Sequence, residues 1–249
     1  TVSKALNGKA DISEAARQAI DKALKDNGYI RRVSPSRKQR TIEVVFRDFE
    51  TIWALEVLRG IITEAKPHNI NVMVAESGDR QHPDSSWVEG IIGAILVFSN
   101  LTDKERSMFQ SHGIPFVVFD PSGNPALDDL SVQADNWMGG VIATRHLLEL
   151  GHKRIGIVTG PDEMLCSRAR LDGYSAALAE RNIPTSPELI TEGDFTTPGG
   201  YEGAMALLED EQSRPTAIFA GNDLQAMGVY EAARQLKIRI PEDLSVIGF

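Results

Sequence analysis

Apolar and polar residues alternate in blocks along most of the chain, and the blocks predict strands and helices in turn. Short runs rich in β-branched residues have the continuous hydrophobicity of strands that are buried on both faces. These runs lie at 42–46, 70–75, 94–98, 115–119, 155–159, 216–220 and 244–247. Between them, apolar residues recur with helical spacing. The helical segments lie at about 53–66, 102–112, 136–150, 167–181, 199–209 and 223–236. This alternation predicts an α/β fold with parallel sheets flanked by helices.

The alternation starts again near residue 136, which predicts two similar lobes. Leu150, Gly151 and His152 end one helical segment with a glycine just past its last turn, and a new strand follows. We therefore assign residues 41–135 to an N-terminal lobe and residues 136–249 to a C-terminal lobe.

The first forty residues differ from the rest in pattern and in charge. A helix is predicted over 13–26, with Ser13 as its N-cap, and the charged segment 31–40 is typical of a linker. Residues 1–40 hold ten Lys/Arg and four Asp/Glu, whereas the other 209 residues hold sixteen and thirty-one. Because Lys and Arg neutralise phosphates, a nucleic-acid contact is expected in the basic front part. On charge alone, a solvated linker is an equal alternative.

Composition and motifs narrow the possible functions. No segment approaches the ~18 consecutive apolar residues that a membrane helix needs. The single cysteine, Cys166, cannot form an internal disulfide, which suits the cytoplasm. Phosphate-binding loops, nucleophile elbows and zinc-binding helix motifs are absent, and the five histidines have no metal-ligand spacing. We therefore expect binding without turnover, no metal and no cofactor.

Polar residues follow several predicted strands at the end where open parallel sheets bind ligands. Arg47 and Asp48 follow the first strand, Asp120 follows the fourth, and Asn222 and Asp223 come after the run at 216–220. Each of them alone is more typical of a turn or a helix cap. Their shared placement predicts a cleft lined by acids and amides.

Two aromatic residues and an arginine extend this prediction. Trp53 falls in the first turn of a helix, Phe195 lies in the polar loop 193–199, and Arg170 lies early in another helix. An aromatic ring beside hydrogen-bonding groups suits a sugar, which has apolar C–H faces and a rim of hydroxyls. On the residues alone, Trp53 is more typical of a core, and Arg170 of a surface ion pair.

The segment Thr1-Val2-Ser3-Lys4-Ala5-Leu6-Asn7-Gly8 resembles the recognition-helix signature of the lactose-repressor/galactose-repressor (LacI/GalR) family of bacterial transcription regulators. The resemblance continues to Pro241-Glu242-Asp243-Leu244-Ser245-Val246-Ile247-Gly248-Phe249 and covers essentially the whole chain. It implies a pair of periplasmic-binding-protein-like lobes that bind a small carbohydrate effector between them. It also implies a cytoplasmic homodimer that represses transcription from operator DNA, without enzymatic activity or membrane contact.

The resemblance assigns residues to both binding events. It implies that the effector is bound by Trp53, Asp120, Arg170, Phe195, Asn222 and Asp223. It implies DNA contacts by Thr1, Ser3, Lys4 and Asn7, and we expect Arg31 and Arg32 of the linker to contact phosphates. Lys4 stands where the family more often has arginine, which changes the bases that we expect it to prefer.

Three departures from the family pattern modify these expectations. Residues 1–30 resemble only part of a helix-turn-helix domain, and the chain stops before the family's last pocket acid, so we expect a fragment. The linker segment 33–36 offers no hinge helix that could wedge into the minor groove. A periplasmic sugar-binding protein and a doubly wound enzyme are the alternatives. The basic helical front argues against the first, and the missing motifs argue against the second.

Overall fold

A computed structural model describes residues 13–26, 40–47, 52–76, 90–99, 101–123, 126 and 128–249. The chain divides into two units between Gln39 and Arg40. In the first unit, the described helix is α2 (Glu14–Asp26), and the Ser13 hydroxyl accepts a hydrogen bond from the Ala16 N–H at 3.4 Å, as expected of an N-cap. The expected DNA contacts lie outside the described residues, namely Thr1, Ser3, Lys4, Asn7, Arg31 and Arg32. Asp48 also lies outside them.

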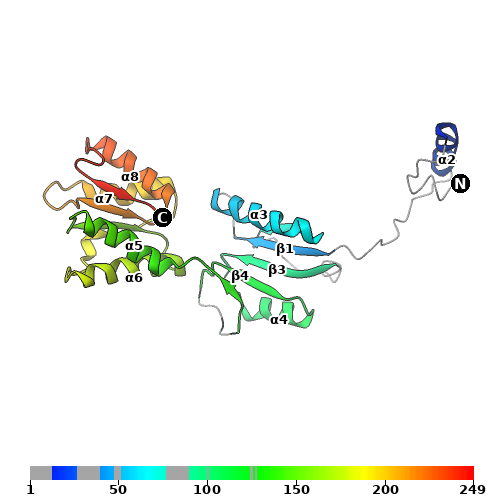
Figure 1. Cartoon of the computed structure of the whole chain (residues 1–249), viewed down its shortest axis with the longest axis horizontal. Helices are drawn as coiled ribbons and strands as arrows, with labels where there is room; N and C mark the ends of the chain where they lie inside the picture. Colours follow the sequence, from blue (N-terminus) through cyan, green and yellow to red (C-terminus); the bar gives the residue numbers. More distant parts are fainter. Residues whose placement is uncertain are drawn as a thin grey trace. The chain divides into compact units, whose positions relative to one another are not determined.

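The second unit begins with a parallel sheet in the order β2-β1-β3-β4-β5. Its strands are β1 (Thr41–Phe46), β2 (Asn71–Glu76), β3 (Ile91–Val97), β4 (Phe116–Phe119) and β5 (Ser131–Val132). The helices α3 (Ile52–Ala65) and α4 (Asp103–Ser111) lie on opposite faces of this sheet (Figure 1). A short 3-10 helix, η1 (Lys66–His68), follows α3. Neighbouring residues of β1 point to opposite faces of the sheet. Val44 packs with Ala54 of α3 on one face, and Val45 packs with Phe109 of α4 on the other.

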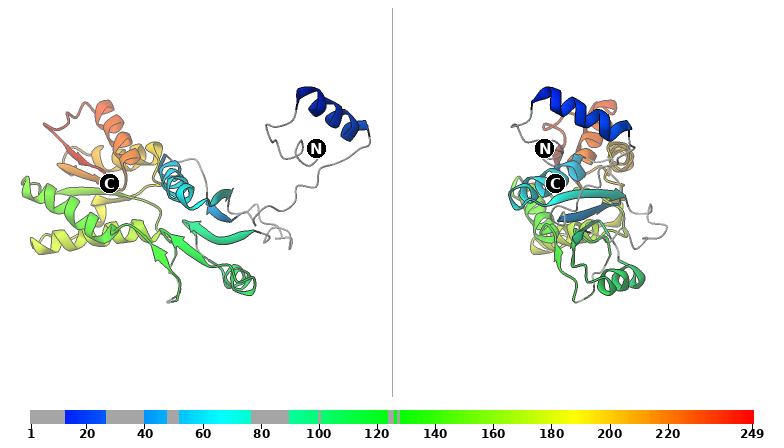
Figure 2. Two further views of the ribbon diagram at one scale, coloured as in Figure 1. Left: turned by 45° about the vertical axis from the view of Figure 1, so that its right-hand side comes forward. Right: turned by 90° about the vertical axis from the view of Figure 1, so that its right-hand side faces the viewer.

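A second parallel sheet follows in the order β7-β6-β8-β9. Its strands are β6 (Ile155–Thr159), β7 (Ile190–Glu192), β8 (Ala217–Ala220) and β9 (Ser245–Ile247), and η2 (Pro187–Leu189) precedes β7. The helices α5 (Asn136–Glu149) and α6 (Leu165–Glu180) pack together on one face, and α7 (Thr197–Leu208) and α8 (Asp223–Gln235) pack together on the other (Figures 1 and 2). Every residue of β6 and β8 is buried, as predicted for strands covered on both faces.

The two sheets repeat one topology. In each, the second strand in sequence lies outside the first, and the chain then crosses to the third and fourth strands on the other side. This order brings the carboxyl ends of β6 and β8 side by side, and ligands bind at such edges of open parallel sheets. The predicted α/β fold with two parallel sheets is therefore confirmed, whereas the helix-turn-helix remnant stays a prediction. Among the described helices, none is long and apolar enough to cross a membrane.

Candidate functional site

The Arg170 guanidinium connects three elements at the carboxyl edge of the second sheet. Its Nε and Nη2 donate hydrogen bonds to Asn136 Oδ1 at 3.0 and 2.8 Å. Its Nη1 donates to the carbonyl oxygen of Gly221 at 2.5 Å. Asn136 begins α5, Arg170 belongs to α6 and Gly221 follows β8. Among the described residues, Arg170 takes part in no ion pair, so the alternative that its residue type alone favoured is not found there.

Two aromatic rings flank this guanidinium. The guanidinium carbon lies 3.7 Å from the centroid of the Phe249 ring and 5.5 Å from that of Phe195. Both distances fall within the range of cation–π attraction. Phe249 follows β9, so the rule that selected residues after strands could have found it. The cation thus lies close to two apolar rings, where its electrostatic attraction is less screened than in water.

Asp120 is a carboxylic acid that interacts electrostatically with Arg170. It follows β4, its exposed fraction is 6%, and its φ of 51° lies in the left-handed region that aspartate tolerates better than most residues. Burial raises the pKa of Asp120, and the charge of Arg170 and a hydrogen bond with Asn136 lower that pKa in part. Burial likewise lowers the pKa of Arg170. The buried Asp120 carboxyl and the half-buried Arg170 guanidinium therefore influence each other.

Phe195 has a strained backbone that its neighbours hold in place. Its φ is 65°, a rare conformation for a bulky residue. The amide Nδ2 of Asn222 donates a hydrogen bond to the Phe195 carbonyl oxygen at 2.9 Å. The ring lies directly over Gly160, where a Cβ would overlap it. Strain of this kind clusters at functional sites.

Asn222 and Asp223 occupy the start of α8. Asn222 Oδ1 accepts a hydrogen bond from the Gln225 N–H at 2.8 Å, so Asn222 is the N-cap of α8 and also fixes Phe195. The Asp223 carboxylate lies against Gly248, next to β9. Asn222 therefore has the helix-capping role that its sequence position alone favoured. It also holds the Phe195 backbone in position.

Trp53 lies among apolar residues of the first lobe. Its ring stacks on Phe98 with centroids 4.5 Å apart and contacts Phe119 at 5.7 Å. These residues belong to one cluster around Val44 and Phe46. The described contacts thus join Asp120, Arg170, Phe195 and Asn222 in one network, whereas those of Trp53 are with its own core. Arg47 pairs with Glu163 at 3.9 Å, and both side chains are exposed.

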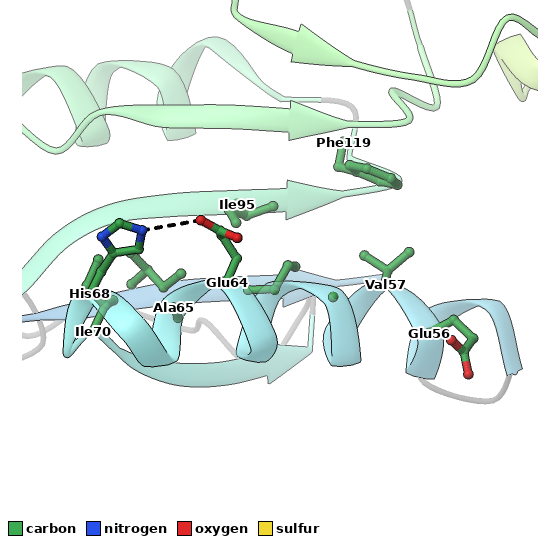
Figure 3. Close-up of a pocket in the computed structure, with 11 residues that line it drawn as sticks. Glu56, Val57, Glu64, Ala65, His68, Ile70, Ile95 and Phe119 are labelled. Carbon is green, nitrogen blue, oxygen red and sulfur yellow. Dashed lines mark hydrogen bonds and ion pairs between the residues drawn. The ribbon is translucent and has the colours of Figure 1, made fainter.

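A cavity of about 520 Å³ lies elsewhere, between α3 and the first sheet (Figure 3). It is lined by Ile42, Glu56, Val57, Gly60, Ile61, Glu64, Ala65, His68, Ile70, Ile95 and Phe119. Figure 3 shows Glu64 and His68 paired at its edge, 3.2 Å apart. None of the predicted effector residues lines it.

Comparison with known proteins identifies the family. Residues 144–249 match the periplasmic binding protein-like domain. The chain is 33% identical over 258 residues to the HTH-type transcriptional repressor CytR of Escherichia coli (strain K12), with 100% of this chain and 75% of CytR covered. The crystal structure of a LacI family transcriptional regulator from Enterococcus faecium, with bound ribose, matches with a TM-score of 0.74 at 27% identity, covering 84% of this chain and 77% of that one. The chain belongs to the LacI family.

Another match is the transcriptional regulator CelR in complex with cellobiose, at 29% identity and a TM-score of 0.76. It covers 100% of this chain and 77% of that one. These relatives are transcriptional regulators and not enzymes. The family resemblance seen in the sequence is therefore confirmed, and the chain is a LacI-family transcription repressor with a periplasmic-binding-protein-like effector domain.

Proposed function

We propose that this LacI-family chain binds a small carbohydrate between its two lobes and that the carbohydrate controls its affinity for operator DNA. The observation that supports the proposal most directly is the Arg170 guanidinium, held between the Phe195 and Phe249 rings and electrostatically coupled to Asp120. A sugar needs charged or amide groups for its hydroxyls and an apolar surface for its C–H faces. The regulators solved with cellobiose and with ribose give the class of ligand to test.

The proposed contacts divide by chemistry. Arginine has five N–H donors, of which Arg170 uses three within the protein, so two remain for sugar oxygens. Asp120 and Asp223 supply acceptors for hydroxyl protons, and Asn222 supplies an amide. Phe195 and Trp53 supply aromatic faces. These six residues are the effector site that we propose.

The DNA side of the proposal rests on the family resemblance. We assign residues 1–30 to part of a helix-turn-helix domain and 31–40 to a linker, followed by lobes at 41–135 and 136–249. Operator contacts then come from Thr1, Ser3, Lys4, Asn7, Arg31 and Arg32. The protein acts in the cytoplasm as a homodimer. Exposed apolar side chains on α8 support the dimer, since Met227 and Tyr230 are 57% and 45% exposed.

The site assignment is tested by Arg170→Ala. A thermal-shift screen of pentoses, hexoses and disaccharides, with D-ribose and cellobiose included, first identifies a sugar that binds. A ligand at ~100 times its dissociation constant stabilises the protein by about 2.7 kcal/mol. Loss of charge-assisted hydrogen bonds from Arg170 is expected to weaken sugar binding by about 2–3 kcal/mol and to leave operator binding unchanged.

Arg154→Ala is the matched control. Arg154 also donates a hydrogen bond to a backbone carbonyl, that of Ser213 at 2.7 Å, but it lies away from the proposed site. Its sugar affinity should equal that of the wild type. A wild-type sugar response in Arg170→Ala would remove Arg170 from the site.

A further inference from the structure

Asn136 has a fixed orientation between two charged groups of the proposed site. Its exposed fraction is 5%. Its Nδ2 donates to the Ala134 carbonyl oxygen at 3.1 Å, and its Oδ1 accepts both hydrogen bonds from Arg170. Arginine has donors and no acceptor, so the amide oxygen must face the guanidinium. The amide therefore cannot turn over without losing three hydrogen bonds.

Asn136 is a neutral partner for the Nε–Nη2 edge of the Arg170 guanidinium, which is unusual. The Nε–Nη2 edge of arginine matches a carboxylate, which binds it with two oxygens and neutralises its charge. Here a single amide oxygen fills that edge, and a second neutral acceptor, the Gly221 carbonyl, takes Nη1. Among the described residues, no carboxylate lies within ion-pair distance of Arg170. The guanidinium is thus held firmly while its charge stays uncompensated by direct contact.

We propose that Asn136 is a positioning residue of the effector site that fixes the Arg170 guanidinium without neutralising it. The inference rests on the proposed function and deepens it. A neutral anchor keeps the positive charge of Arg170 and its two remaining N–H groups for electron-rich oxygens of the ligand. A carboxylate at the same place would hold the guanidinium equally well and would take its charge away.

Two variants separate anchoring from neutrality. Asn136→Ala removes the acceptor and the Nδ2 donor, and Asn136→Asp keeps the size and the acceptor, loses the Nδ2 donor and adds a negative charge. Asn182→Asp, at an exposed position just after α6, adds the same charge outside the site. The first measurement needs no ligand and is the exchange rate of the Arg170 Nε–H by NMR. The second is the affinity for D-ribose and cellobiose, and the third is the carboxyl-carbon NMR titration of Asp120.

If Asn136 positions Arg170, each variant should give a distinct result. In Asn136→Ala, the Arg170 Nε–H exchanges at least tenfold faster and sugar affinity falls at least tenfold. In Asn136→Asp, the Nε–H stays as protected as in the wild type, yet sugar affinity still falls at least tenfold. The pKa of Asp120 rises in both Asn136 variants, because both lose the hydrogen bond with Asn136, and it rises further in Asn136→Asp, because Arg170 then shares its charge with a second carboxylate. Asn182→Asp behaves as the wild type in all three measurements.

The opposite results overturn the inference. Unchanged Nε–H exchange in Asn136→Ala would mean that Asn136 does not position Arg170. Wild-type sugar affinity in Asn136→Asp, or an Asp120 pKa equal to that in Asn136→Ala, would mean that neutrality is unimportant and the role is purely structural. If the wild type binds no sugar of the screen, the proposed ligand class fails, and the two ligand-free measurements still decide whether Asn136 positions Arg170.

Discussion

Asp120 shows how a single residue can favour binding at the expense of stability. Its carboxyl group is buried, and burial disfavours the charged form more than Arg170 and Asn136 favour it, so its pKa is raised from 3.8. A raised pKa means that the folded protein binds the proton more tightly than the unfolded chain does. The free energy of unfolding therefore falls as pH rises from the ordinary pKa through the raised one. At neutral pH, where the carboxyl of the unfolded chain is ionised, the raised pKa of Asp120 therefore destabilises the fold.

Asp120→Asn is consequently expected to raise the melting temperature at neutral pH. Asparagine tolerates the left-handed backbone at this position and carries no charge to bury. The gain should disappear below pH 3.8, where the wild-type carboxyl is protonated in both states. Calorimetry across pH measures this difference, and Asp162→Asn, at an exposed position, is the control. A melting temperature equal to or below that of the wild type at neutral pH would show that the charged form is not destabilising.

The network around Arg170 was only partly predictable from the sequence. Asp120 and Asn222 were predictable because each follows a strand at the carboxyl edge of its own sheet. Asn136 was missed because its position at a helix start is typical of a cap, and its partner lies 34 residues away. The contact arises from the packing of α5 against α6, which no local pattern encodes. Gly221 contributes only its carbonyl oxygen, which side-chain chemistry cannot indicate.

At the scale of elements, hydrophobic periodicity predicted the long helices and buried strands and missed the short edge strands. β5 and β7 have two and three residues, too few to show a period, and they exist because each pairs with a longer neighbour. Helix α6 begins at Leu165, two residues before the predicted start. Met164 precedes it in an extended conformation without a side-chain cap, so the sequence carried no start signal there.

Two glycines within helices, one with open space beside it and one at a helix–helix contact, test the packing of α5 against α6. A Cβ added to Gly60 of α3 would have no atom within 4 Å, whereas a Cβ on Gly173 of α6 would meet the backbone of Trp137 and Val141 in α5. Gly60→Ala should stabilise the protein by about 1 kcal/mol, because alanine favours a helix interior. Gly173→Ala should destabilise it by about 1–3 kcal/mol, because the two helices must separate. Urea unfolding measures both, and equal effects of the two substitutions would contradict the described α5–α6 contact.

On the scale of the whole molecule, charge and binding are distributed between different parts of the chain. Residues 1–40 are basic and the rest is acidic, so the negative charge of the lobes favours DNA contact through the front alone. If a sugar changes operator affinity by some factor, the operator must change sugar affinity by the same factor. For the two sites to be coupled, sugar binding in the lobes must change the arrangement of the DNA-binding part. A dimer supplies a contact surface through which that structural change can pass.

The proposed homodimer can be tested on α8. Met227 and Tyr230 are three residues apart and therefore lie on one side of the helix, exposed, while Ala226, Val229 and Ala233 are buried in the core. Met227→Glu places a charge on this apolar surface and is expected to shift the protein to monomer in sedimentation velocity, because desolvating an unpaired charge opposes association. Leu150→Glu is the control, since Leu150 is 61% exposed at the end of α5 and away from α8. Because Met227 is not part of the core, the monomeric variant should still unfold cooperatively, with a melting temperature that no longer depends on protein concentration. A dimer of undiminished affinity in Met227→Glu would exclude this surface of α8 from the interface.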